Sequence, residues 1–236
     1  MADSPDSSAA QDLPTALITG ASRGLGAAIA RELAGTHRLL LGARSAGSLR
    51  DIRAELPDAR AWPVDLTDYD ALAAATAPIE RLDVLVHNAG VAELGPIAES
   101  SVAQWRTTME ANVIAVAEST RLLLPALRAA NGHVVLINSG AGLRANPGWG
   151  VYAASKFALR AFGDALRLEE PELRVTSIHP GRIDTDMQRA IIAQERREYD
   201  PGEFLTAATV ARTVRNAIET PRDAHPTEIV LRPIAR

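Results

Sequence analysis

Lys156 is the only lysine in a chain that carries 25 lysine and arginine residues, and it follows Tyr152 by four positions. On a helix, residues i and i+4 share a face, so the ammonium group is expected to lie close to the phenol. Arginine cannot imitate this compact cation. A positive charge there stabilises phenolate and lowers the tyrosine pKa from about 10. The pair therefore predicts a proton donor usable near neutral pH; the alternative is a structural tyrosine packed on a lysine stem.

A second segment with chemical potential, residues 19–26, reads Thr-Gly-Ala-Ser-Arg-Gly-Leu-Gly. It follows the short apolar run 16–19 and opens a helical pattern, which is the context of a phosphate-binding loop. Glycines let the backbone approach a pyrophosphate, and the N–H groups at the helix start face the anion. The segment predicts a dinucleotide site, whereas a plain turn is the alternative.

The elements that must position these residues alternate along the chain. Strands separated by helices of this length indicate βαβ units and a parallel sheet covered on both faces. We expect an α/β fold, a Rossmann-type doubly wound sheet of about seven strands in a single domain, residues 15–236, after a frayed tail, 1–14. The expected strands are 16–19, 38–42, 61–64, 84–87, 133–138, 175–179 and 228–231, and the expected helices are 24–35, 48–56, 68–76, 101–128, 152–169 and 207–219.

Composition narrows the class of protein. The net charge is −4, and the arginines are scattered among 29 acidic residues, so we expect no nucleic-acid partner. The absence of cysteine excludes disulfides and thiolate metal sites, and we expect no metal. No apolar stretch is long enough to cross a membrane. The N-terminus lacks the features of a signal peptide, so the protein is expected to be cytoplasmic.

With the motifs TGxxxGxG and YxxxK, the chain resembles the short-chain dehydrogenase/reductase family from residue 15 to about 233. Further marks follow in the family's order: Asp65-Leu66, 87–90, Asn112, Ser139, Pro180-Gly181 and Thr185. The resemblance implies hydride transfer from NADPH to a ketone or aldehyde, or the reverse oxidation of an alcohol.

The resemblance also assigns four catalytic residues. Ser139, at the end of the apolar run 133–138, would hold the carbonyl oxygen, and Tyr152 would be the general acid/base. Lys156 would bind the nicotinamide ribose, and Asn112 would hold a water that connects this lysine to solvent. His87 stands where the family more often has asparagine, and we interpret it as a core-edge residue without a catalytic role.

Cofactor binding is implied for residues at several strand ends. Because Ala43 replaces the aspartate of NAD-specific members, and Arg44 follows it, the cofactor is expected to be NADP(H). Arg23 adds a second cation; the alternative is that both arginines are ordinary surface residues. Asp65 is expected to accept from the adenine amino group or to cap the next helix. The full predicted set is Gly20, Ser22, Arg23, Gly24, Leu25, Gly26, Ala43, Arg44, Asp65, Leu66, Asn88, Ala89, Gly90, Tyr152, Lys156, Pro180, Gly181, Ile183 and Thr185.

The substrate is a small carbonyl or alcohol compound by the same resemblance. Leu143, Trp149 and Met187 are predicted to line an apolar pocket, with Phe204 beside them and residues 187–206 as a lid. The C-terminal sequence lacks the glycine-rich ending of ketoacyl reductases, which argues against a 3-oxoacyl substrate. A binding sensor or scaffold without turnover, a 3-oxoacyl-type reductase, and an epimerase or dehydratase stay as alternatives. Apolar side chains on more than one face of helices 101–128 and 152–169 predict a homodimer or homotetramer.

Overall fold

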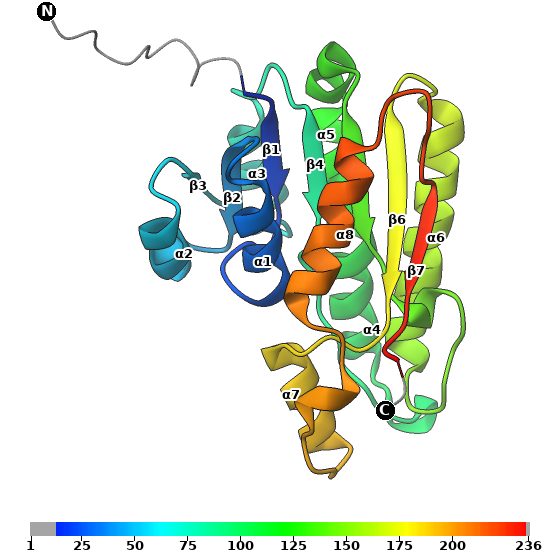
Figure 1. Cartoon of the computed structure of the whole chain (residues 1–236). Helices are drawn as coiled ribbons and strands as arrows, with labels where there is room; N and C mark the ends of the chain where they lie inside the picture. Colours follow the sequence, from blue (N-terminus) through cyan, green and yellow to red (C-terminus); the bar gives the residue numbers. More distant parts are fainter. Residues whose placement is uncertain (1–12, 235–236) are drawn as a thin grey trace, which may run out of the picture.

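The fold is a seven-stranded parallel sheet with helices on both faces (Figure 1). The computed structural model describes residues 13–234, so positions 1–12 of the predicted tail lie outside the described residues. The strands run in the order β3-β2-β1-β4-β5-β6-β7, which confirms the predicted doubly wound sheet. Their bounds are β1 Thr15–Ile18, β2 Arg38–Ala43, β3 Arg60–Pro63, β4 Val84–His87, β5 His133–Ile137, β6 Arg174–Pro180 and β7 Glu228–Leu231.

The strand order reverses at β1, which pairs with β2 on one side and with β4 on the other. Ile18 is in register with Leu41 of β2 and with Val86 of β4. In such sheets the carboxyl ends of the strands on either side of the reversal form a crevice where ligands bind. The site must therefore be sought where β1, β2, β4, β5 and β6 end.

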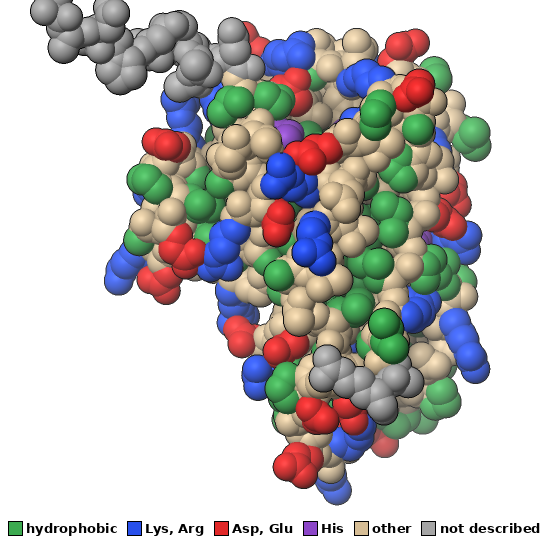
Figure 2. All heavy atoms as spheres, in the orientation of Figure 1, with side chains coloured by type: hydrophobic (Ala, Val, Ile, Leu, Met, Phe, Trp, Pro, Cys, Tyr) green, Lys and Arg blue, Asp and Glu red, His purple; other side chains and the backbone are tan. Residues whose placement is uncertain are grey.

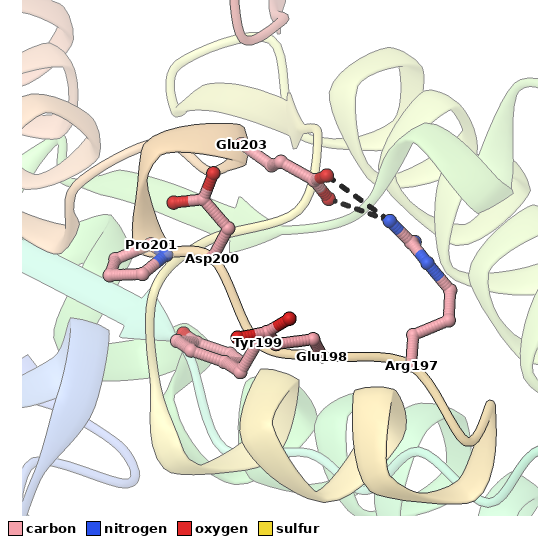
Figure 3. Close-up of a pocket in the computed structure, with 6 residues that line it drawn as sticks. All are labelled: Arg197, Glu198, Tyr199, Asp200, Pro201 and Glu203. Atoms are coloured by element: carbon pink, nitrogen blue, oxygen red, sulfur yellow. Dashed lines mark hydrogen bonds and ion pairs between the residues drawn. The ribbon is translucent and has the colours of Figure 1, made fainter.

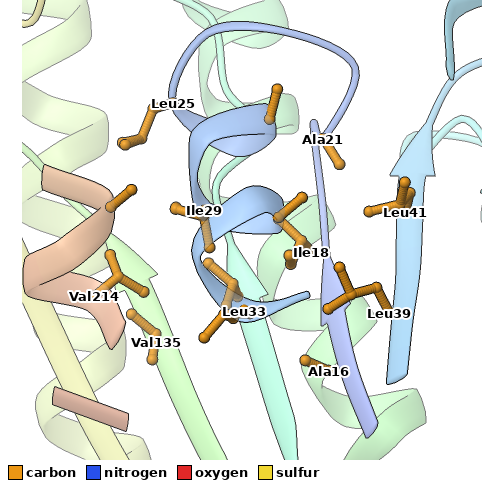
Figure 4. Packing of buried hydrophobic residues seen from close by; sticks show 14 of the residues in the cluster. Ala16, Ile18, Ala21, Leu25, Ile29, Leu33, Leu39, Leu41, Val135 and Val214 are labelled. Atoms are coloured by element: carbon orange, nitrogen blue, oxygen red, sulfur yellow. The ribbon is translucent and has the colours of Figure 1, made fainter. Parts of the chain in front are cut away.

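Alternating side chains of the central strands build two cores. On one face of the sheet, Ile18 and Val135 are covered by Ile29 and Leu33 of α1 and by Val214 of α8 (Figure 4). Figure 1 places α1 and α8 side by side on this face. The helices are α1 Gly24–Leu33 and α8 Ala207–Glu219.

The opposite face is covered by α3, α5 and α6. Leu17, adjacent to Ile18 in sequence, joins Leu85 and Leu136 in a second cluster with residues from these helices, because successive strand residues point to opposite faces. The remaining helices are α2 Arg50–Glu55, α3 Tyr69–Thr76, α4 Val102–Met109, α5 Ala115–Ala130, α6 Gly150–Glu169 and α7 Asp186–Gln194.

Two helical predictions need correction. The helix expected over 101–128 is interrupted by a π-helical turn, Glu110–Ile114, which separates α4 from α5. The segment 187–206 was expected only as a lid, but it begins with the regular helix α7, which Thr185 caps by accepting from the Gln188 N–H. The spacing Thr-x-x-Gln is a helix-start signature that could have predicted it.

The surface carries both charge signs in close alternation. Figure 2 shows acidic and basic side chains interspersed over one face, including the projection that contains α7. Several arginines pair with acidic neighbours, among them Arg31 with Glu55 and Arg160 with Glu228. Within residues 13–234, no helix is both long and apolar enough to span a membrane.

Candidate active site

Ser139 stands two residues beyond the end of β5, at the carboxyl edge of the sheet. Its backbone N–H donates to the Asn138 side chain at 2.8 Å, and its hydroxyl accepts from the Ala141 N–H at 3.1 Å. The Tyr152 phenol lies near enough to this side chain for Ser139 to lower its pKa. The structure therefore brings two predicted catalytic groups, 13 positions apart in sequence, close together.

Lys156 lies one helical turn beyond Tyr152 on α6, as the i and i+4 spacing predicts. Its Nζ is 5.7 Å from the centre of the Tyr152 ring and donates to the Ile137 carbonyl at 3.0 Å. The lysine is 6% exposed, whereas Ser139 and Tyr152 are half-buried. Ser139 and Tyr152 thus keep part of their surface exposed, whereas the lysine beside them is buried. Burial lowers the pKa of Lys156 to about 8, since a charged ammonium is poorly solvated there.

The direction of the Tyr152 pKa differs from the prediction. Burial raises the pKa of the phenol above its ordinary value of 10, and the hydrogen bond with Ser139 opposes this only in part. The expected lowering by Lys156 fails in this structure because desolvation of the phenolate is the larger effect. The phenol is therefore protonated at neutral pH, which suits a proton donor.

Asn112 lies in the π-helical turn and is 1% exposed. Its amide nitrogen donates to the Val91 carbonyl at 2.9 Å and to the Ser155 hydroxyl at 3.0 Å, while its oxygen accepts from the Val91 N–H at 2.9 Å. A Cβ on Gly90 would come within 3.0 Å of that oxygen and 4.0 Å of the Lys156 Nζ. The asparagine thus fixes the loop after β4 beside the lysine.

The glycine loop connects β1 to α1 in a conformation that needs glycine. Gly20 and Gly24 have φ angles of +65° and +56°. At Gly26 a Cβ would lie 2.2 Å from the Gly20 carbonyl oxygen, so no larger residue fits. Arg23, at the N-cap of α1, provides no side-chain cap, and the first turn holds no acidic residue. The start of the helix thus has the backbone N–H groups and the positive potential that fit a pyrophosphate.

The loop after β4 is pinned to the glycine loop. The Thr19 hydroxyl accepts from the N–H groups of Asn88 and Ala89, both at 3.0 Å. The Asn88 side chain donates to the carbonyls of Thr19 and Gly20 at 3.0 and 3.1 Å. Gly90 completes this predicted group, and all three residues after β4 are half-buried. Thr19, which was not among the predicted site residues, is the residue that joins the two loops.

The edge formed by β2 and β3 has the predicted charge pattern. Ala43 ends β2, and the exposed Arg44 follows it. Hydrogen bonds from Thr67 lower the pKa of Asp65, and the positive charge of Arg44 lowers it further. Asp65 does not cap α3, so that alternative is wrong: Asp68 does, accepting from the Ala71 N–H.

The other side of the crevice is formed by the segment after β6. Pro180 ends the strand, and the Gly181 N–H donates to the Leu231 carbonyl at 2.8 Å. Ile183 forms a bridge with Leu205, and Thr185 caps α7. A Cβ on Gly24 would contact the Thr185 side chain at 3.5 Å. The glycine loop and the β6–α7 segment therefore lie against each other at the carboxyl edge of the sheet.

The three predicted pocket residues have different surroundings. Trp149 packs against Tyr152 with ring centres 5.9 Å apart, Leu143 is half-buried, and Met187 is 43% exposed on α7. Phe204 instead packs against Tyr199 within the lid. The open hollow in Figure 3 lies in the lid, and none of the four predicted catalytic residues lines it. Its lining residues are Arg197, Glu198, Tyr199, Asp200, Pro201 and Glu203.

His87 is a core residue, as interpreted from the sequence. It is 2% exposed, and its Nε2 lies 2.9 Å from the Thr120 hydroxyl. Burial lowers the pKa of the imidazole to about 3, so it is neutral in any ordinary buffer.

Comparisons with known proteins agree with this geometry. A family model described as short chain dehydrogenase matches residues 14–196. The short-chain type dehydrogenase/reductase y4eK of Sinorhizobium fredii, itself uncharacterized, is 35% identical over 220 residues, covering 87% of this chain and 86% of that protein. Glycine betaine reductase ATRR of Emericella nidulans is 34% identical over 235 residues, covering 92% of this chain. The chain spans only 18% of that fungal protein's length.

Solved structures show the same fold. An alcohol dehydrogenase from the archaeon Thermococcus sibiricus, complexed with 5-hydroxy-NADP, has a TM-score of 0.87 at 28% identity. The match covers 95% of this chain and 98% of that one. A serine dehydrogenase complexed with NADP+ has a TM-score of 0.83 at 26% identity and covers 92% and 93% of the two chains.

The parallel sheet, the glycine-rich loop after β1 and the cluster of Ser139, Tyr152 and Lys156 after β5 lie in the order predicted for one family of oxidoreductases. The chain belongs to the short-chain dehydrogenase family, as the sequence predicted. It is an oxidoreductase of that family.

Proposed function

We propose that the protein is an NADPH-dependent reductase of ketones or aldehydes, able to run in reverse as an alcohol dehydrogenase. The observation that carries this proposal is the contact between Ser139 and Tyr152, both half-buried, above the buried ammonium of Lys156. Two hydroxyl groups that meet at an accessible point can both donate to one carbonyl oxygen.

In this proposal the bound cofactor supplies the hydride, and the protein supplies placement and protons. The Ser139 hydroxyl holds the substrate oxygen, and the Tyr152 phenol gives its proton to that oxygen as negative charge develops. Lys156 holds the nicotinamide ribose and replaces the proton. Asn112 holds a water beside the lysine; because its side-chain amide is used by Val91 and Ser155, its backbone is the better water ligand.

The residues around the crevice fit NADP(H). The uncapped start of α1 takes the pyrophosphate, Arg44 and Arg23 take the 2′-phosphate, and Ile183 and Thr185 take the carboxamide of the nicotinamide. The structural neighbours with bound NADP+ or its 5-hydroxy derivative support this choice over NAD. Residues 187–206 form the lid over the substrate, and the cytoplasmic location stays a prediction.

The test is NADPH oxidation by the full-length protein with a panel of ketones, aldehydes, quinones and ketoesters. We expect turnover with at least one class. Tight NADPH binding without turnover on any of them would contradict a reductase and favour a binding sensor.

Arg44, directly after β2, and Arg23, in the glycine loop, are expected to select the 2′-phosphate. A hydrogen bond to a charged group contributes about 1.5–3 kcal/mol, so NADPH should exceed NADH by at least about tenfold in kcat/KM. Because Arg23 also pairs with Asp186 at 3.4 Å, Arg44 should contribute the larger part of the preference for NADPH. Arg44→Ala should narrow the gap by weakening NADPH alone, measured by steady-state kinetics with both cofactors.

Arg222→Ala provides the control for this measurement. Arg222 donates to the Asn131 carbonyl, two residues before β5 begins and thus at the opposite edge of the sheet. Its loss should leave the cofactor ratio unchanged. Equal use of NADPH and NADH by the unaltered enzyme would disprove the assignment.

Assembly is expected to use the outer faces of α4, α5 and α6. Val102, Ile114 and Phe157 are 65%, 47% and 42% exposed there, and such apolar side chains favour a symmetric contact. We expect light scattering to give a dimer or tetramer of the 25.1 kDa chain, and Phe157→Glu to shift it toward monomer. The control variant Met187→Glu, at a side chain on α7 that is 43% exposed, should leave the measured mass unchanged. A monomeric mass for the unaltered protein at micromolar concentration would refute assembly.

A further inference from the structure

Trp149 lies directly beside the proposed proton donor. It is the N-cap residue of α6, three positions before Tyr152, so the two side chains share one face of the first helical turn. Their ring centres are 5.9 Å apart and the ring planes are inclined by 65°, a stable aromatic contact. Both side chains are half-buried, so the indole adjoins the point where a carbonyl compound must reach the phenol.

Arg182, in the segment after β6, stacks on this indole. Its guanidinium lies over the Trp149 ring at 5.3 Å and donates to both carboxylate oxygens of Glu195, one of them at 2.9 Å. Glu195 is the C-cap residue of α7. Stacking and bidentate pairing both need the planar guanidinium. The end of the lid helix is thus tied, through Arg182, to the tryptophan that packs on Tyr152.

The charge balance of this contact affects which substrates it favours. The Arg182 cation is paired with Glu195, which also lies 3.7 Å from the Arg197 guanidinium, and the side chains of Glu195 and Arg182 are less than a third exposed, at 24% and 29%. A substrate carboxylate would gain little from this cation and would lose hydration against the indole. A flat aromatic group beside the carbonyl would instead gain an aromatic contact.

We propose that Trp149, held in place by Arg182 and Glu195, is the specificity-determining surface of the site and favours aryl ketones and aromatic aldehydes. This inference rests on the proposed carbonyl reduction. Arg182 acts through Trp149 and is a positioning residue for it. It lies in the Pro-Gly-Arg sequence after β6, one residue from the predicted cofactor residue Ile183.

The kinetic test compares acetophenone with cyclohexyl methyl ketone, which has a saturated ring of the same size. Trp149→Leu and Arg182→Leu should each lower the ratio of their kcat/KM values by about two- to tenfold, the worth of one aromatic contact. The loss should appear in KM for acetophenone, with NADPH affinity unchanged. Arg182→Lys should recover only part of the ratio, because an ammonium cannot stack and pair in the same way.

Arg31→Leu is the matched control. Arg31, in the last turn of α1, also donates to both oxygens of one carboxylate, that of Glu55 on α2, at 2.6 and 2.9 Å, and this pair involves neither α6 nor the segment 187–206. Its loss should leave the ratio unchanged. An unchanged ratio in Trp149→Leu, or an equal fall in Arg31→Leu, would overturn the inference.

A second readout does not depend on turnover. The chain has three tryptophans, so 5-fluorotryptophan labelling gives three fluorine NMR signals, and Trp149→Phe assigns one of them. Arg182→Leu should shift the Trp149 signal and leave the other two in place, and Arg31→Leu should leave the Trp149 signal where it is. With NADP+ bound, acetophenone should shift this signal more than the saturated ketone does.

The two measurements separate the possible failures. No reduction of any carbonyl compound by the unaltered enzyme would contradict the proposed function. Normal reduction, with a Trp149 signal that ignores both Arg182→Leu and acetophenone, would contradict the specificity surface alone.

Discussion

Replacing Tyr152 with phenylalanine is expected to lower kcat for carbonyl reduction by about 10²–10⁴, the usual worth of general acid catalysis. The variant keeps the ring that packs on Trp149 and loses only the hydroxyl that meets Ser139. Affinity for NADPH should change by no more than about a few-fold, because in the proposed mechanism the phenol donates to the substrate oxygen. Stopped-flow hydride transfer and fluorescence titration measure the two quantities separately.

Tyr199→Phe is the control for this variant. The Tyr199 hydroxyl donates to Asp184 at 2.5 Å in the lid, so its removal tests the loss of a tyrosine hydroxyl away from Ser139. It should affect KM more than kcat. If Tyr152→Phe kept more than about a tenth of the original kcat, the assignment of Tyr152 as the acid would be wrong.

The raised pKa of Tyr152 bears on the direction of the reaction. Reduction leaves an alkoxide, a far stronger base than a phenolate, so a phenol with a raised pKa still gives up its proton readily. Oxidation needs the phenolate as base, and burial makes that form scarce at neutral pH. Alcohol oxidation should therefore increase with pH through the neutral range up to about pH 8, where Lys156 begins to lose its charge, while reduction should not need alkaline pH.

The strands were predictable because each is a short apolar run between turn residues. Every predicted strand end lies within one residue of the observed one; β4, for example, is Val84–His87 in both. The alternation of helices and strands then predicted a doubly wound sheet. Since the carboxyl ends of the strands meet at one edge of the sheet, the motifs that follow the strands could be assigned to a common site from the sequence alone.

Contacts between distant side chains were not predictable in this way. The stack of Arg182 on Trp149 joins residues 33 positions apart, and nothing in either local sequence signals it. The same holds for the Tyr152 pKa, because the sequence shows the neighbouring lysine but not the extent of burial. The π-helical turn at Asn112 had a partial signal, since an asparagine within an apolar helical run needs partners.

Removing the charge of Lys156, the single lysine, should also have a large effect on NADPH binding and turnover. In Lys156→Met a side chain of similar length keeps the packing, but the proposed donor to the nicotinamide ribose is lost. A hydrogen bond to a charged group contributes about 1.5–3 kcal/mol, so the Kd of NADPH should rise by about 10- to 100-fold, with kcat falling as well. Unchanged NADPH affinity and turnover would mean that this lysine is only structural.

The pH profile tests the charge itself. Burial lowers the pKa of Lys156 to about 8, so the ammonium is present below that pH and is lost as the pH rises through it. If the charge is needed, kcat/KM for NADPH should fall above about pH 8. Tyr152 cannot cause this fall, because burial raises its pKa above 10. In Lys156→Arg the guanidinium stays charged over the whole range, so the fall near pH 8 should disappear, whatever the remaining activity. A profile in that variant that still fell at the same pH would assign the titration to another group.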